Sequence, residues 1–231
     1  MTQATSAGAV RGVQASATSQ HGQHRKVAAA SLIGTAVEWY DYFIYGTYAA
    51  LLFPKLFFPG MDPLAGTIAA FATYAVGFAA RPVGAAVFGH YGDRVGRKAM
   101  LVISLLMMGG STVLIGLLPT YGTAGIWAAV LLCVLRLVQG FAVGGEWGSA
   151  VVMAVEHAPA NRRGLYGSFP QMGVPLGLLL STGVFAITSA SLSEADLLAW
   201  GWRIPFLASI VMIGIGMFIR LGVQESPVFE K

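Results

Sequence analysis

Six long apolar segments constrain the fold of this chain more than any other feature of its sequence. They cover residues 27–53, 64–88, 99–118, 126–155, 165–187 and 204–221. Each has about the length that a helix needs to cross the hydrocarbon core of a bilayer. Only 10% of the residues are charged, whereas about 25% are charged in an ordinary soluble domain. We therefore predict an all-α membrane protein with six transmembrane helices.

Residues 1–24 differ from the rest of the chain. They are rich in alanine, serine, threonine, glutamine and glycine, and they contain no apolar run. This composition is typical of disorder, and it lacks the short apolar core and cleavage site of a signal peptide. We expect a disordered cytoplasmic tail at 1–24, followed by a six-helix transmembrane bundle at 25–231.

The basic residues between the apolar segments predict the orientation, because lysine and arginine accumulate on the cytoplasmic side. One predicted side carries Arg11, Arg25, Lys26, Arg94, Arg97, Lys98, Arg162, Arg163, Arg220 and Lys231. The other side carries Lys55 and Arg203. Both termini are therefore expected in the cytoplasm. The net charge of +4 then reflects topology, and we expect no nucleic-acid partner.

Two acidic residues lie inside the first apolar segment, where a charge costs about 2.5–3.5 kcal/mol near the bilayer centre. Glu38 and Asp41 are three residues apart, so a helix places them on one face, together with Tyr45. One interpretation is a structural ion pair with a buried arginine. The other is a carboxylate that takes up and releases a proton when its surroundings rearrange. Asp41 is the first candidate for proton coupling, and Glu38 is the second.

Arg136 lies at a similar depth in the fourth apolar segment, with Gln139 one turn away. A buried guanidinium favours a carboxylate partner, either on the chain or on a bound substrate. Arg81 precedes Pro82 in the second segment, and it could either extend to the membrane interface or face a cavity. Gln171, beside a proline of the fifth segment, is a weaker polar candidate.

The sequence offers no sign of an enzyme. We find no nucleophile with a base at a suitable spacing, and no histidine and cysteine cluster that would bind a metal. Cys133 is the single cysteine, so no internal disulfide is possible. We expect no metal and no cofactor, only a proton as coupling ion.

The connection between the second and third segments carries a known motif. It reads Gly89-His90-Tyr91-Gly92-Asp93-Arg94-Val95-Gly96-Arg97-Lys98. This resembles the pattern G-x-x-x-D-R-x-G-R-K of the major facilitator superfamily, which lies in the cytoplasmic loop between its helices 2 and 3. The run Arg136-Leu137-Val138-Gln139-Gly140 resembles the R-x-x-Q-G pattern of that superfamily's fourth helix.

Further stretches resemble the metabolite:H⁺ symporter family within this superfamily. They lie at residues 38–46, 77–84, 170–177 and 220–229. The resemblance implies a multi-pass protein of the plasma membrane, the inner membrane in bacteria. It implies proton-coupled symport of a small organic metabolite, a carboxylate or a zwitterionic osmolyte, by alternating access.

The resemblance also implies roles for individual residues. Helices 1 and 4 line the central cavity in the superfamily, so Asp41 and Glu38 would exchange protons. The candidates for substrate binding are Arg136, Arg81, Tyr45, Gln139 and Gln171. Asp93, Arg97 and Glu156 would form a cytoplasmic charge lock, within a gate motif that also includes Gly89, Arg94, Gly96 and Lys98.

The superfamily normally has twelve helices in two halves, and this chain resembles the N-terminal six. We expect its partner to be the C-terminal half of the transporter or a second copy of the chain. Two alternatives to symport remain open. One is a uniporter or a drug exporter of the same superfamily, and the other is a sensor or assembly subunit without flux.

Overall fold

The computed structural model describes residues 29, 31–156 and 158–221. The described residues form six long helices and no strand, which confirms the predicted fold class. The first helix covers residues 31–51. The others are α3 (Pro63–Val95), α4 (Arg97–Leu117), α6 (Ile126–Glu156), α7 (Arg163–Ser191) and α9 (Arg203–Leu221). The predicted tail at 1–24 lies outside the described residues.

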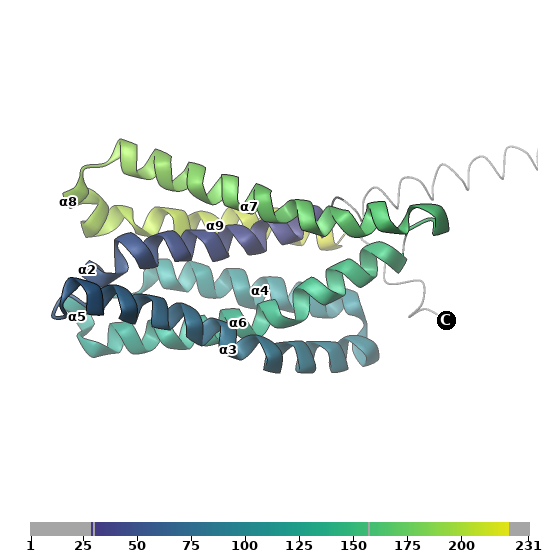
Figure 1. Cartoon of the computed structure of the whole chain (residues 1–231), viewed down its shortest axis with the longest axis horizontal. Helices are drawn as coiled ribbons and strands as arrows, with labels where there is room; N and C mark the ends of the chain where they lie inside the picture. Colours follow the sequence, from purple (N-terminus) through teal and green to yellow (C-terminus); the bar gives the residue numbers. More distant parts are fainter. Residues whose placement is uncertain (1–28, 30, 157, 222–231) are drawn as a thin grey trace, which may run out of the picture.

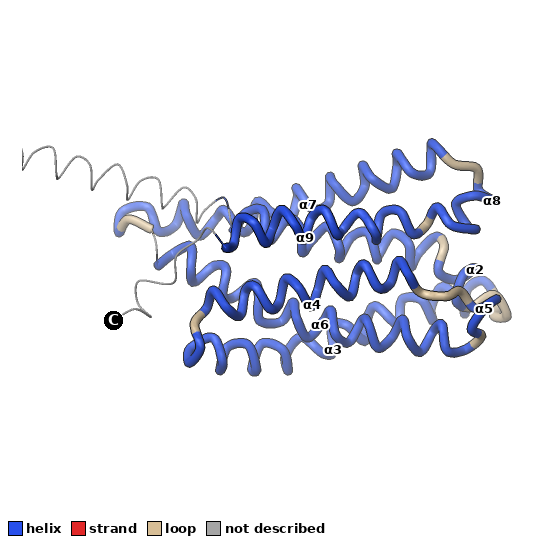
Figure 2. The backbone as a smooth tube through the Cα atoms, turned by 180° about the vertical axis from the view of Figure 1, so that it is seen from behind, coloured by secondary structure: helices blue, strands red, loops and turns tan. Residues whose placement is uncertain are grey.

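The long helices lie side by side along the longest axis of the molecule, and short elements connect them at the two ends (Figures 1 and 2). The connecting helices are α2 (Phe53–Phe57), α5 (Tyr121–Ala124), α8 (Glu194–Asp196), a 3₁₀ turn at Ala160–Arg162 and a π turn at Leu197–Gly201. The chain thus runs up and down through the bundle, as expected for a multi-pass membrane protein.

Four helices of the described chain are long and apolar enough to cross a membrane, namely α3, α4, α6 and α7. A fifth span forms if α9 is joined with the segment Glu194–Gly201, which is bent from it by 49°. The first helix is not among them, because it carries Glu38, Asp41 and four tyrosines among its residues. Its polarity fits its position, since much of its surface is buried among the other helices.

Helix α3 is longer than the sequence analysis predicts. It continues to Val95, so Gly89, Asp93 and Arg94 lie in its last turns rather than in a loop. The break is confined to Gly96, whose φ of 111° is open to glycine but strained for other residues. Helix α4 begins at the next residue. The expectation of a loop over the whole motif is therefore wrong, because the earlier glycines are accommodated inside the helix.

Glycines bring the backbones of α3 and α6 into contact. A Cβ atom placed on Gly140 would lie 1.8 Å from the carbonyl oxygen of Gly77, and one on Gly84 would lie 1.9 Å from that of Phe141. Small residues permit such close approach between helices in membranes. The contact fixes the depth and rotation of α6, and with them the position of Arg136.

We expect the substitution Gly140→Ala to lower the melting temperature in detergent by roughly 5 °C or more, because the methyl group has no room to enter. Gly110→Ala is the matched control, since a Cβ atom at Gly110 meets nothing within 4 Å. Thermal unfolding of both variants checks the prediction. A wild-type melting curve for Gly140→Ala would show that α3 and α6 are not in backbone contact.

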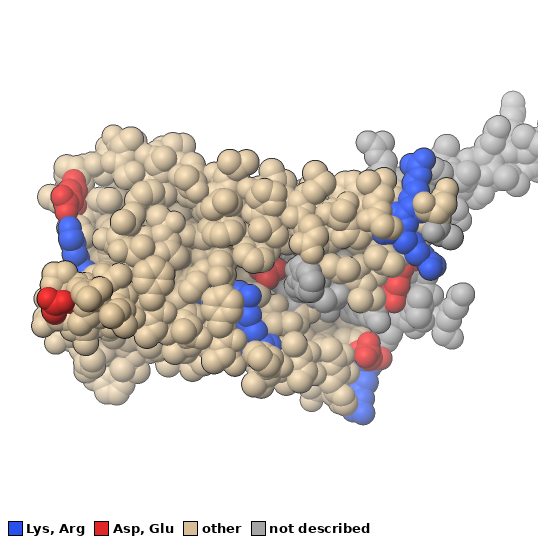
Figure 3. Space-filling model, viewed as in Figure 1, with Lys and Arg blue, Asp and Glu red and all other residues tan. Residues whose placement is uncertain are grey.

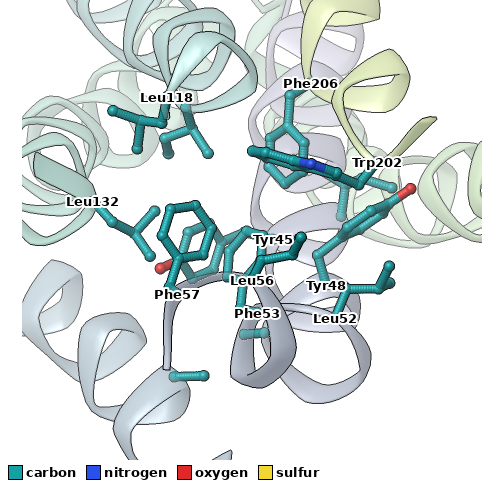
Figure 4. Close-up of a cluster of buried hydrophobic side chains, with 14 of the residues drawn as sticks. Tyr45, Tyr48, Leu52, Phe53, Leu56, Phe57, Leu118, Leu132, Trp202 and Phe206 are labelled. Carbon is teal, nitrogen blue, oxygen red and sulfur yellow. The ribbon is translucent and has the colours of Figure 1, made fainter. Parts of the chain in front are cut away.

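An aromatic cluster fills the core at the end of the bundle near α2 and α5 (Figure 4). Its rings come from the first helix, α2, α9 and the residue before α9: Tyr45, Tyr48, Phe53, Phe57, Phe206 and Trp202. Ring centroids lie 5.1 Å apart for Phe53 and Phe57, and 5.2 Å apart for Tyr48 and Phe206. The cluster anchors the end of the first helix, and therefore the height at which its acidic residues lie.

Candidate functional site

Asp41 is buried in the middle of the bundle, with 2% of its surface exposed. Its Oδ1 accepts a hydrogen bond from Ser209 of α9 at 2.7 Å. Its Oδ2 accepts one from Thr112 of α4 at 2.8 Å. Each carboxylate oxygen therefore has a donor on a different helix, which is how proteins accommodate a buried charge.

A chain of hydrogen bonds connects Asp41 with Arg136. The Nη1 of Arg136 donates to Oε1 of Gln139 at 2.8 Å, and Nε2 of Gln139 donates to the hydroxyl of Thr112 at 2.6 Å. The Thr112 hydroxyl in turn donates to Asp41. A direct ion pair was one expectation from the sequence, but in the described residues the guanidinium is joined to Asp41 through two side chains, Gln139 and Thr112. We call Asp41, Thr112, Gln139 and Arg136 the relay.

Two aromatic rings hold the guanidinium of Arg136 in place. Its central carbon lies 3.9 Å from the ring centre of Tyr45 and 4.8 Å from that of Tyr74. The hydroxyl of Tyr45 is hydrogen-bonded to Thr73 of α3. A desolvated cation–π contact contributes about 2 kcal/mol. Tyr45 thus contacts the predicted binding residue Arg136, although it does not itself line the pocket described next.

A pocket opens beside the relay, between the first helix, α3, α4 and α6. Its lining consists of Glu38, Trp39, Asp41, Tyr42, Gly77, Arg81, Met108, Arg136, Gln139, Gly140 and Val143. Its volume is about 20 Å³, which is room for one water molecule. Five of the residues predicted from the sequence are therefore brought together: Glu38, Asp41, Arg81, Arg136 and Gln139.

Charged side chains on the visible face gather at the two ends of the bundle, and a few others lie near its middle (Figure 3). Arg81 lines the pocket rather than extending away from it, and its guanidinium lies 4.4 Å from the ring centre of Phe78 and 5.3 Å from that of Tyr42. Gln171 is exposed on α7 and is not part of the pocket lining.

The gate motif lies at the end of the bundle where α3 meets α4. Asp93 and Arg94 are exposed, and Glu156 is half-buried as the last residue of α6. The Nζ of Lys98 donates to the carbonyl oxygen of Leu221 at 3.0 Å, which ties α4 to the end of α9. The Arg97 side chain lies outside the described part, so the charge lock of Asp93, Arg97 and Glu156 stays a prediction.

Several residues of the site had not been singled out from the sequence, among them Thr112, Ser209, Tyr74 and Trp39. Thr112 and Ser209 are hydroxyl residues on otherwise apolar helices, and this is the signal that could have pointed to them. Trp39 lies between the two acidic residues of the first helix, and an aromatic residue in an apolar segment gives no separate signal of function.

Residues 26–230 match the family model described as "Sugar (and other) transporter". The chain therefore belongs to this family of the major facilitator superfamily, and its fold is that of the superfamily's N-terminal half. It is a multi-pass membrane protein whose relatives are transport proteins rather than enzymes.

Among these relatives, the inner membrane metabolite transport protein YhjE of Escherichia coli K12 is 55% identical, over 89% of this chain and 47% of its own length. The shikimate transporter of E. coli K12 is 51% identical, over 90% of the chain and 47% of its length. The proline/betaine transporter of the same strain is 41% identical, over 91% of the chain and 42% of its own length. The chain spans about half the length of the curated relatives it matches.

Solved structures show the same fold. The inward-open xylose transporter XylE from E. coli superimposes with a TM-score of 0.77 at 20% identity, over 89% of this chain and 49% of that chain. A crystal structure of the D-xylose-proton symporter gives a TM-score of 0.78 at 20% identity, over 90% of this chain and 50% of that chain. At this identity, the likeness concerns the arrangement of the helices alone.

Proposed function

We propose that this chain is half of a secondary active transporter that takes up a small organic metabolite together with a proton, by alternating access. The observation that carries the proposal is the relay, because it links a buried carboxylate on the first helix to a buried arginine beside a pocket. Asp41 is the first candidate for the site of proton exchange. Glu38, which lines the same pocket, is the second candidate.

The relay provides a physical route for coupling. A substrate carboxylate that binds the Nε–H of Arg136 draws the positive charge of the guanidinium toward itself and weakens the hydrogen bond from Nη1 to Gln139. When this bond weakens, the hydrogen bond from Gln139 to Thr112 is free to rearrange, and the donors around Asp41 change. Hydrogen bonds to a carboxylate alter its affinity for a proton. Substrate and proton therefore influence each other's binding, and the coupling is reciprocal.

The pocket favours a substrate with a carboxylate group. Two arginines line it, Arg81 and Arg136, and a guanidinium matches a carboxylate with two parallel hydrogen bonds. The relatives named for shikimate and for proline and betaine carry molecules that share this group. The space beside the relay has room for about one water molecule, and we expect a second half, either six further helices or another copy, to complete the cavity.

The function is tested by accumulation of radiolabelled shikimate, proline and betaine in proteoliposomes under an inward proton gradient. The chain is reconstituted alone and together with the six C-terminal helices of the E. coli relative YhjE. We expect one of these compounds to accumulate and a protonophore to abolish the accumulation. Uptake that is insensitive to the protonophore would instead support the uniporter alternative.

The relay itself leads to a prediction for Thr112→Val, which removes the hydroxyl at nearly constant volume. The change leaves Oδ2 of Asp41 and Nε2 of Gln139 without this partner, and a hydrogen bond to a charged group contributes about 1.5–3 kcal/mol. We expect proton-driven accumulation to fall at least tenfold, while exchange of labelled for unlabelled substrate continues.

Ser111→Ala is the matched control for Thr112→Val. Ser111 is also buried, but its hydroxyl donates to the backbone of its own helix, to the carbonyl oxygen of Met107. Accumulation should remain near the wild-type level in this variant. Equal losses in the two variants would mean that α4 is merely sensitive to substitution and that the relay has no role in coupling.

A further inference from the structure

Two buried nitrogen donors beside the pocket have no hydrogen-bond partner in the described part of the chain. They are the indole Nε1 of Trp39 and the Nε of Arg136. Both residues line the pocket. A buried donor without a partner costs about 1–3 kcal/mol, and native structures leave few of them. Two such donors on one small pocket are available to a ligand that brings the acceptors.

Other contacts already hold the guanidinium of Arg136, and its Nε is the donor that the described residues leave for a ligand. Nη1 donates to Gln139, and the rings of Tyr45 and Tyr74 cover the guanidinium. The side chain has only 5% of its surface exposed. The guanidinium is therefore held in one orientation before the ligand arrives, which lowers the entropic cost of binding.

Trp39 is held just as firmly. A Cβ atom on Gly177 of α7 would lie 2.7 Å from the Cβ of Trp39, so the backbones of α7 and the first helix are in close contact there. The indole ring packs against Tyr42, with ring centroids 5.0 Å apart, and against Phe43, at 5.4 Å. A fixed indole with a free N–H presents a single donor in a defined direction.

We propose that Trp39 is a specificity-determining residue of the transport site, whose indole N–H donates to an oxygen of the bound metabolite while the Nε–H of Arg136 donates to its carboxylate. This inference rests on the proposed function and deepens it. The substrate class is a carboxylate that reaches both donors with two oxygen atoms. A ligand that leaves the indole unpaired loses affinity, because the desolvation of that donor is not recovered.

The test compares two conservative variants, Trp39→Phe and Trp202→Phe, in the reconstituted chain. Trp202 is a matched control, because its Nε1 is also buried and has no partner among the described residues, but its ring belongs to the aromatic cluster and does not line the pocket. Dissociation constants are measured by calorimetry with shikimate, 2-oxoglutarate and betaine as probes. We expect Trp39→Phe to weaken binding of a carboxylate probe about 5- to 10-fold, the loss of one hydrogen bond. Trp202→Phe should change it less than twofold.

Ultraviolet resonance Raman spectroscopy of the unaltered chain gives a second readout that needs no folded variant at position 39. The band that reports hydrogen bonding of the indole N–H should shift when a bound probe is added, and Trp202→Phe should keep this shift. Binding without the shift, or equal weakening in both variants, would overturn the role of Trp39 and leave the transport proposal intact. If no probe binds either to the chain or to its assembly with the C-terminal helices, both proposals fail.

Discussion

Asp41→Asn is expected to abolish proton-driven accumulation of the substrate while leaving the protein folded. Asparagine has nearly the same shape as aspartate, and its amide oxygen still accepts the hydrogen bond that Ser209 donates to Asp41. It cannot exchange a proton, so a gradient can no longer drive net uptake. Exchange of labelled for unlabelled substrate should continue, because that process needs no net proton movement.

The control for Asp41→Asn is the same chemical change at Asp62. This residue caps the first turn of α3 by accepting a hydrogen bond from the backbone N–H of Leu64 at 3.0 Å, and asparagine caps helices equally well. Substrate accumulation by the Asp62→Asn variant should equal that of the unaltered chain. Normal accumulation by Asp41→Asn would remove Asp41 from the coupling mechanism and leave Glu38 as the remaining candidate.

Arg136→Lys should raise the substrate concentration needed for half-maximal transport by roughly 30- to 100-fold. Lysine keeps the positive charge but loses the planar group that donates to Gln139 and packs on the rings of Tyr45 and Tyr74. A lost charge-assisted hydrogen bond and a lost cation–π contact each contribute about 2 kcal/mol, only part of which is recovered by the ammonium group. Initial uptake rates over a range of substrate concentrations measure the effect.

Arg203→Lys is the matched control, since Arg203 also donates to a fixed acceptor, the carbonyl oxygen of Leu118 at 2.8 Å, but lies at the end of α9 outside the pocket. Its transport constant should change less than twofold. If Arg136→Lys transports with an unchanged constant, then Arg136 contributes only its charge, and a bidentate contact with a substrate carboxylate is ruled out.

The sequence was sufficient to predict the six long helices and the charged residues that line the pocket. Segment length and hydropathy locate the helices, and a charged residue in an apolar segment is visible without a structure, as with Asp41, Arg81 and Arg136. The connection at Gly96 was harder, because glycines inside a helix and glycines that end one look alike in sequence. Only the positive φ of Gly96 separates it from Gly89 and Gly92.

The relay could not be predicted, because it depends on which faces of four helices meet. Thr112 and Ser209 are ordinary hydroxyl residues until α4 and α9 pack against the first helix. The close contact of α3 with α6, which rotates Arg136 toward Tyr45, depends in turn on Gly77 and Gly140. A carboxylate and an arginine at one depth therefore indicated a site correctly, but the side chains between them required the packed structure.

The most direct test of proton coupling through Asp41 is proton influx into proteoliposomes that contain a trapped pH-sensitive dye. The chain is assembled with the six C-terminal helices of the E. coli relative YhjE. This assembly is compared with the same assembly carrying Asp41→Asn. We predict that shikimate, proline or betaine acidifies the interior of vesicles with the unaltered chain, and that the same compound causes no acidification with Asp41→Asn. Equal acidification in both would contradict a proton pathway through the relay.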